Sequence, residues 1–182
     1  MRISDDRYSR DRLRLDLALR FLNHGARTHT IRDWTMLSDD RIRKLYRSYV
    51  LPANGPPRQR GKSPQQVGFF IRGARAQHET GVLASFFSLL GVVPKTQLAD
   101  ATLTLPCLVR GERLCQAFEL FTAIFPAARI SFEHAIFLVT ALARGNEIDY
   151  GRCTDCTALI VVDRLNLRET RCLLCARGSR SC

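Results

Sequence analysis

Two cysteine pairs near the C-terminal end of the sequence constrain its fold more than any other feature. Cys153 and Cys156 form one Cys-x2-Cys pair, Cys172 and Cys175 form a second, and fifteen residues separate the pairs. This spacing is typical of sites in which four cysteines bind one zinc ion. Four thiolates complete a tetrahedral shell and leave no position for a catalytic water, so the ion would be structural.

A redox-active Cys-x-x-Cys motif is the alternative explanation of these pairs. It requires a thioredoxin-like βαβ unit, and the sequence around the pairs predicts none. Residues 158–163 and 165–167 are instead strand-like, so we expect a small ribbon that brings the pairs together. Of the other three cysteines, Cys107 and Cys115 are predicted to lie in the core and Cys182 to be a free terminal thiol.

Positive charge is concentrated in the first half of the sequence. The 182 residues carry 28 Lys and Arg against 17 Asp and Glu, a net charge of +11, and residues 1–80 alone account for +9. Residues 41–78 hold nine cations and no acid. A solubilising surface usually mixes both signs, so this stretch favours a polyanionic partner such as nucleic acid. A solvated cationic surface is the alternative.

The first fifty residues predict three helices in a helix-turn-helix plan. Apolar residues between Leu13 and Leu22 predict a helix that ends at Gly25, and residues 30–36 predict a short second helix. Ser38 is a typical N-cap residue, and it begins a third helix that reaches Tyr49. No glycine marks the turn between the last two helices, and a plain helical bundle is the alternative.

The third predicted helix has an apolar face and a basic face. The apolar residues recur at the helical period, and they are Ile42, Leu45, Tyr46 and Tyr49. The opposite face is basic and could enter a major groove. Prolines and glycines then predict an extended basic loop. Helix and loop together supply the expected DNA-binding residues: Arg43, Lys44, Arg47, Arg58, Arg60 and Lys62.

These features predict a mainly α fold in four parts. A helix-turn-helix-like segment spans residues 1–51, a basic Pro/Gly loop residues 52–66, a helical core and partner-binding region residues 67–150, and a small zinc ribbon with four cysteine ligands residues 151–182. Phe, Leu and Ala recur at helical spacing in the third part, which predicts helices over residues 67–76, 82–90, 114–125 and 131–144.

Several functional classes are disfavoured by the sequence. No apolar run approaches the roughly 18 residues of a membrane span, and the N-terminal residues do not form a secretory signal, so we expect a cytoplasmic protein. The glycine-containing stretch around Lys62 has the wrong spacing for a phosphate-binding loop. His78 and Glu79 begin a zincin-like motif that lacks its second histidine. We therefore expect no enzymatic activity.

With these residues in view, the chain resembles the FlhC family of bacterial flagellar transcriptional regulators. The resemblance covers roughly residues 13–176. It is carried by residues 17–27 (LALRFLNHGAR), residues 42–46 (IRKLY), the Gly61-Lys-Ser-Pro64 loop before Phe69-Phe70, and the paired cysteines.

The resemblance implies a function and a set of partners. Members of the family act with the FlhD protein in a heterohexamer usually described as four D and two C subunits. That complex binds promoter DNA upstream of flagellar operons and helps RNA polymerase to start transcription. The C subunit carries one structural zinc ion, which would be bound here by Cys153, Cys156, Cys172 and Cys175.

Two other functions remain open from the sequence. A structural zinc protein could use the helices and the ribbon to build an assembly, with charge that only aids solubility, and it would not bind DNA. A thiol oxidoreductase would carry no zinc and would reduce disulfides.

Overall fold

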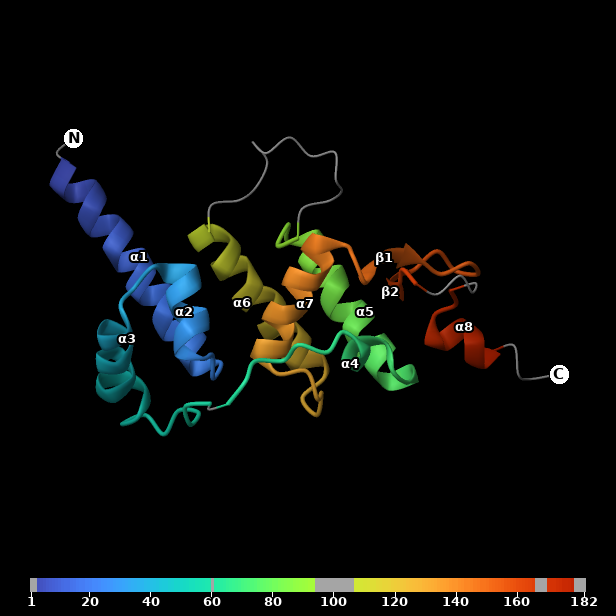
Figure 1. Ribbon diagram of the computed structural model, residues 1–182, viewed down its shortest axis with the longest axis horizontal. Coiled ribbons are helices and arrows are strands. Elements are labelled where there is room, and N and C mark those ends of the chain that lie inside the picture. The colour runs from blue at the N-terminus through green and yellow to red at the C-terminus, as the bar shows by residue number, and fades with distance from the viewer. Residues whose placement is uncertain (1–2, 60, 94–106, 166–169, 179–182) are drawn as a thin grey trace. The chain divides into compact units, whose positions relative to one another are not determined.

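The computed structural model describes residues 3–59, 61–93, 107–165 and 170–178, and these residues are mainly helical (Figure 1). One antiparallel two-stranded sheet is formed by β1 (Ile148–Arg152) and β2 (Leu159–Asp163). The helical elements are α1 (Ile3–Asn23), α2 (Thr28–Thr35), α3 (Asp39–Leu45), the π-helical turn η1 (Tyr46–Val50), α4 (Gly68–Ile71), α5 (Ala74–Leu89), α6 (Cys107–Ile124), α7 (Phe132–Arg144) and α8 (Leu173–Gly178).

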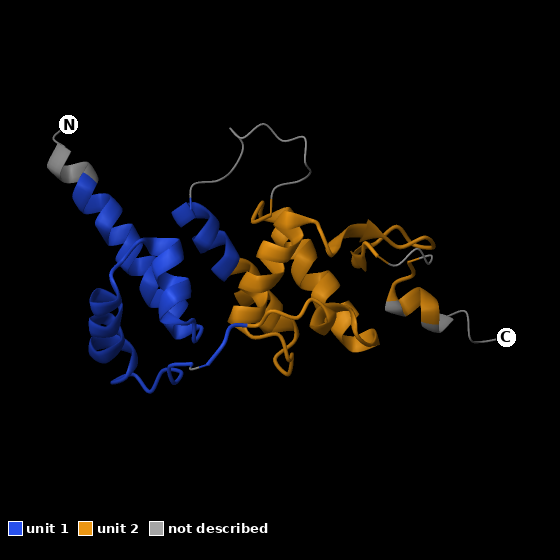
Figure 2. Ribbon diagram, viewed as in Figure 1, with its two compact units in different colours: residues 1–63, 105–115 blue, residues 64–104, 116–182 orange. Residues whose placement is uncertain are grey.

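The chain forms two compact units (Figure 2). Unit 1 comprises residues 1–63 and 105–115, and unit 2 comprises residues 64–104 and 116–182. The predicted mainly α fold with a C-terminal cluster of four cysteines is confirmed. No helix among the described residues is long and apolar enough to cross a membrane.

Unit 1 is organised around α1, which ends as the sequence predicts. Gly25 has a φ of 73°, and the amides of Gly25 and Ala26 bond to the carbonyls of Leu22 and Phe21 at 2.9 Å each. This pair of bonds is the Schellman motif, which favours glycine because the left-handed conformation strains other residues. The Phe21 ring packs 5.8 Å from Trp34 of α2 and is fully buried.

The turn between α2 and α3 is tight although it lacks glycine. Met36 itself adopts the left-handed conformation, with φ 59° and ψ 21°, and its amide bonds to Arg32 O at 2.7 Å. Ser38 then caps α3 as predicted, because its side chain accepts a hydrogen bond from the Arg41 amide. Asp39 and Asp40 occupy the first turn of α3, where the helix dipole favours acids.

The third helix departs from the prediction in its last turn. It changes from α to π geometry at Tyr46, and Leu51 N bonds to Tyr46 O at 2.9 Å across five residues. Ile42 and Val50 are both buried, but Tyr49 is 62% exposed. The expectation that Tyr49 lies on the buried face is wrong, because the wider π turn moves the next buried position to Val50.

Unit 2 packs its helices around buried phenylalanines. The helix expected over residues 67–76 is divided, because Gly73, at φ 88°, separates α4 from α5. α7 begins at its Ser131 cap and ends at Gly145, which has a φ of 60°. The fully buried rings in this unit are Phe70, Phe87, Phe121 and Phe132.

The sheet of unit 2 uses a strand that the sequence prediction missed. β2 (Leu159–Asp163) falls within the expected strand 158–163, but its partner is β1, which precedes the first cysteine pair. Ile148 pairs with Asp163, and Arg152 pairs with Leu159. The predicted strand over residues 165–167 lies mostly outside the described residues. Six residues join β1 to β2, and they include Cys153 and Cys156.

Candidate metal centre and nucleic-acid interface

The four paired cysteines come together at one end of the β1–β2 hairpin. Cys153 and Cys156 lie in the hairpin turn, where Cys153 N bonds to Ala158 O at 2.9 Å. Cys172 directly precedes α8, and Cys175 lies within it. The four Sγ atoms all lie within 4.8 Å of one another.

The sulfur spacing fits a tetrahedral metal site. Cys156 Sγ and Cys172 Sγ are 3.6 Å apart, well beyond the roughly 2.05 Å of a disulfide. Four sulfurs at about 2.3 Å from a central ion are separated by about 3.8 Å from one another. The hairpin turn and the start of α8 therefore present four thiols as a metal-binding site requires.

Backbone amides prepare this site for negative charge. Cys172 N donates to Cys153 Sγ at 3.2 Å, and Cys175 N donates to Cys172 Sγ at 3.5 Å. The amides of Cys172 and Cys156 lower the pKa of Cys153 to about 6. Hydrogen bonds to Cys172 and Cys156 raise the pKa of Cys175. A bound cation is what allows neighbouring thiols to ionise together.

The arginines near the metal site are engaged with other groups. Arg171 pairs with Asp155 at 3.4 Å, and Arg152 donates to the carbonyl of Thr157 at 3.3 Å. Both guanidinium groups therefore contact oxygen atoms of the residues between β1 and β2.

The remaining cysteines lie apart from the cluster. Cys115 is buried, as predicted. The prediction for Cys107 is wrong: this residue is exposed, and its thiol donates to Trp34 O at 3.3 Å. Its position at the first residue of α6 leaves the side chain at the edge of unit 1 instead of in its core. Cys182 lies outside the described residues.

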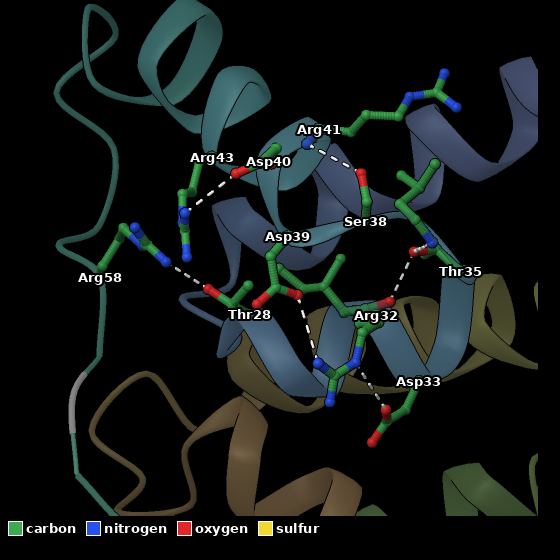
Figure 3. Close-up of polar contacts among 12 residues, drawn as sticks. Thr28, Arg32, Asp33, Thr35, Ser38, Asp39, Asp40, Arg41, Arg43 and Arg58 are labelled. Carbon is green, nitrogen blue, oxygen red and sulfur yellow. Dashed lines mark hydrogen bonds and ion pairs between the residues drawn. The ribbon is translucent and has the colours of Figure 1, made fainter.

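The predicted DNA-binding cations of the third helix fall into two classes. Arg43 donates to Asp40 at 3.1 Å, so an adjacent acid offsets part of its charge (Figure 3). Lys44 and Arg47 are not buried and form no ion pair with the described residues. Arg41, one position before the buried Ile42, is also partly offset because it pairs with Asp11 at 3.0 Å.

Acidic residues surround the beginning of α3. Arg32 lies between Asp33 at 3.7 Å and Asp39 at 3.6 Å (Figure 3). Both acids are partly or fully exposed, as is Asp40. The beginning of α3 therefore offers little net positive charge to a polyanion. Uncompensated cations lie instead beyond it, in Lys44 and Arg47.

The basic loop is fastened to the helices of unit 1. Arg58 donates to the Thr28 hydroxyl, and its guanidinium also lies 5.8 Å from the centre of the Tyr46 ring (Figure 3). Ser63 Oγ is 3.0 Å from His29 Nε2. Lys62 is exposed and forms no ion pair with described residues, whereas the predicted Arg60 lies outside them. The loop therefore presents Lys62 from the same unit as α3.

The fold and this cluster define a class: a mainly helical protein with four C-terminal cysteines placed so that they could hold a metal ion. Sequence reasoning placed Tyr49 on the buried face, but its side chain is exposed. A regular helical repeat cannot predict the π turn that causes this difference.

No protein-family model matches the chain, and no curated protein matches it.

Proposed function

We propose that this chain is the DNA-binding subunit of a transcriptional activator that acts with an FlhD-like partner at flagellar promoters. The observation that carries the proposal is that three of the cations expected to contact DNA, Lys44, Arg47 and Lys62 in unit 1, are accessible and form no ion pair with described residues. Lys44 lies in α3, Arg47 in η1 and Lys62 in the following loop, and α1, α2 and α3 each bury apolar side chains in the core. The resemblance to the FlhC family supplies the partner, the promoters and the contact with RNA polymerase.

The cations would act first on the DNA backbone. Each lysine or arginine that neutralises a phosphate releases a condensed counterion, so binding weakens as salt rises. Such contacts fix the position of the protein, and side chains that reach base edges then provide sequence preference. An exposed cation without an internal partner is best suited to this role, because no intramolecular ion pair has to be broken.

We also propose that the metal is zinc. Four thiolates are a ligand set typical of structural zinc sites, and they close the coordination shell. Zinc would hold the β1–β2 hairpin to α8 through two ligands on each side. Its role would be to order this part of unit 2, with a contribution on the order of 10 kcal/mol.

The experiment that tests the proposed function is a salt titration of DNA binding by the chain co-expressed with an FlhD-like partner. Flagellar promoter DNA and scrambled DNA of the same length and composition are compared by fluorescence anisotropy. The proposal expects tighter binding to promoter DNA and a steep loss of affinity with salt. Failure to bind either DNA at any salt concentration would overturn it and favour a structural zinc protein that builds an assembly.

A further inference from the structure

A hollow of about 400 Å³ opens in unit 1 between α1, the end of α2 and the first turn of α6. Three segments that are distant in sequence line it, and all of them belong to unit 1 (Figure 2). The lining includes Arg10, Leu13 and Arg14 of α1, Trp34 and Met36 at the end of α2, and Val109 of α6. The tertiary fold therefore brings these side chains to one surface.

Close packing of α6 on α1 and α2 places this hollow. A Cβ on Gly111 would lie 2.7 Å from Leu17 Cδ2 of α1 and 3.3 Å from Trp34 Cε3 of α2, so the close approach requires glycine. Leu17 is fully buried at this contact. Leu13 lies one turn earlier on the same face of α1, and it is 56% exposed. The apolar face of α1 thus continues past the core into the hollow.

The apolar side chains of the hollow are unusually accessible. Met36 is 75% exposed and Val109 is 43% exposed, in addition to Leu13. Met36 also has a left-handed backbone conformation, with a φ of 59°, which is unfavourable for residues other than glycine. A glycine would relieve this strain, but it would remove a large and adaptable apolar side chain from the surface. Burial of that side chain against a partner would offset both its exposure and its strain.

The charged residues that line the hollow are both basic. Arg10 and Arg14 lie one helical turn apart on α1, and no acid is among the described residues of the lining. Arg14 has only a long ion pair with Asp11, at 3.9 Å, and Asp11 pairs more closely with Arg41, at 3.0 Å. A ligand that carries carboxylates beside its apolar groups would complement this surface.

We propose that this hollow binds an acidic amphipathic helix of a partner protein. Large aliphatic side chains of that helix would contact Leu13, Met36 and Val109, while its carboxylates would face Arg10 and Arg14. Helices bound in such grooves insert apolar anchors spaced i, i+3, i+4 and i+7. An added strand is disfavoured, because the described residues of unit 1 form no strand whose edge could pair with it.

A second copy of this chain would complement the hollow poorly. In a symmetric dimer the same surface faces itself, so the two arginines of one copy would approach those of the other. The inference goes beyond the proposed function, because none of Lys44, Arg47 and Lys62 lines the hollow.

The test titrates the full chain with a synthetic helical peptide and follows the fluorescence of Trp34, the only tryptophan in the sequence. The peptide has leucines at i, i+3, i+4 and i+7, glutamates along both sides of this stripe, and no tryptophan. Because Trp34 lines the hollow, binding should change its emission. A second peptide has lysine in place of each glutamate. It should bind at least about tenfold more weakly, since its charges face arginines.

Two pairs of variants locate the binding site. Leu13→Ser should weaken binding of the glutamate peptide by about 5- to 30-fold. Leu51→Ser should change it by less than about twofold, because Leu51 is similarly exposed, at 59%, but does not line the hollow. Arg14→Gln should lower the salt dependence of binding. Arg12→Gln is its control, since Arg12 also has one long ion pair on α1, at 3.8 Å, and lies outside the lining.

Four results would overturn the inference. They are no binding of the glutamate peptide, equal binding of the two peptides, equal losses in Leu13→Ser and Leu51→Ser, and self-association of the wild-type chain that Leu13→Ser abolishes. The last result would assign the hollow to a second copy. Circular dichroism of each variant checks that the fold is retained. No DNA is present in this assay, so its outcome is independent of the DNA titration that tests the proposed function.

Discussion

Arg75 Nε donates a hydrogen bond to Glu79 Oε1 at 2.6 Å, one helical turn further along α5. The Glu79 side chain is 5% exposed, and the same guanidinium donates to Ala127 O at 2.8 Å. Arg75 therefore compensates a buried carboxylate and ties α5 to the residues between α6 and α7. Although Arg75 belongs to the basic stretch 41–78, its charge is paired with Glu79 within unit 2.

Replacement of Arg75 with alanine is expected to lower stability. The substitution leaves the Glu79 carboxylate buried without its cation, so the free energy of unfolding should fall by about 1–3 kcal/mol. Urea unfolding followed by circular dichroism measures the change. Arg72→Ala is the control, because Arg72 is exposed and forms no ion pair with described residues. Equal stability of the two variants would show that Arg75 does not compensate Glu79.

Neighbouring cations of α3 should contribute unequally to DNA binding. Lys44→Ala is expected to reduce the slope of log affinity against log salt by about one, because one counterion fewer is released. Arg43→Ala should reduce it by less, since Asp40 already offsets part of the charge of Arg43. Anisotropy titrations of both variants at several salt concentrations provide the comparison. A larger effect from Arg43 would mean that its ion pair is exchanged for a phosphate on binding.

Metal analysis should find one zinc ion per chain, and its removal should affect the hairpin selectively. Cys172→Ser removes one of four ligands, so the purified variant should lose its zinc. Hydrogen exchange of the β1 and β2 amides should then become faster, because the ion no longer joins the hairpin turn to α8. Cys107→Ser is the matched control, since this exposed thiol lies outside the cluster. Retention of full zinc by Cys172→Ser would refute the four-cysteine site.

Tyr150 should ionise at higher pH than an ordinary tyrosine. Burial, and secondarily the charge of Asp149, raises the pKa of Tyr150 on β1. Because this pKa is higher in the folded than in the unfolded chain, the neutral phenol stabilises the fold below about pH 10, and that stability is lost as pH rises further. Absorbance at 295 nm follows phenolate formation, and the latest-ionising tyrosine should disappear in Tyr150→Phe.

The same substitution should stabilise the protein slightly. Tyr150 Oη is buried and has no hydrogen-bond partner among the described residues. Removal of an unsatisfied hydroxyl should raise the free energy of unfolding by about 1 kcal/mol at pH 7. Tyr46→Phe provides the contrast, because Tyr46 donates a hydrogen bond to Pro56 O at 3.4 Å. A loss of stability in Tyr150→Phe would mean that its hydroxyl has a partner.

Local chemistry explains which predictions from the sequence succeed. Ser38 caps α3 and Gly25 ends α1 because a side-chain acceptor and a missing Cβ act within a few residues of their own positions. The cysteine spacing likewise predicts one cluster, since two tight pairs need only a modest turn to meet. The conformation of the turn before Ser38 could not be predicted in this way, because Met36 adopts a left-handed conformation that is usual for glycine.

Composition, period and spacing were enough to predict the helical class and the four thiols that gather. The folded chain was needed to show which cations keep their charge, which strand joins Leu159–Asp163, and that Tyr49 faces solvent. These outcomes depend on contacts between residues distant in sequence, such as Arg41 with Asp11, or on a single widened helical turn. A pattern of apolar and charged residues assumes regular geometry and isolated charges, so it contains neither the partner of a cation nor a change from α to π hydrogen bonding.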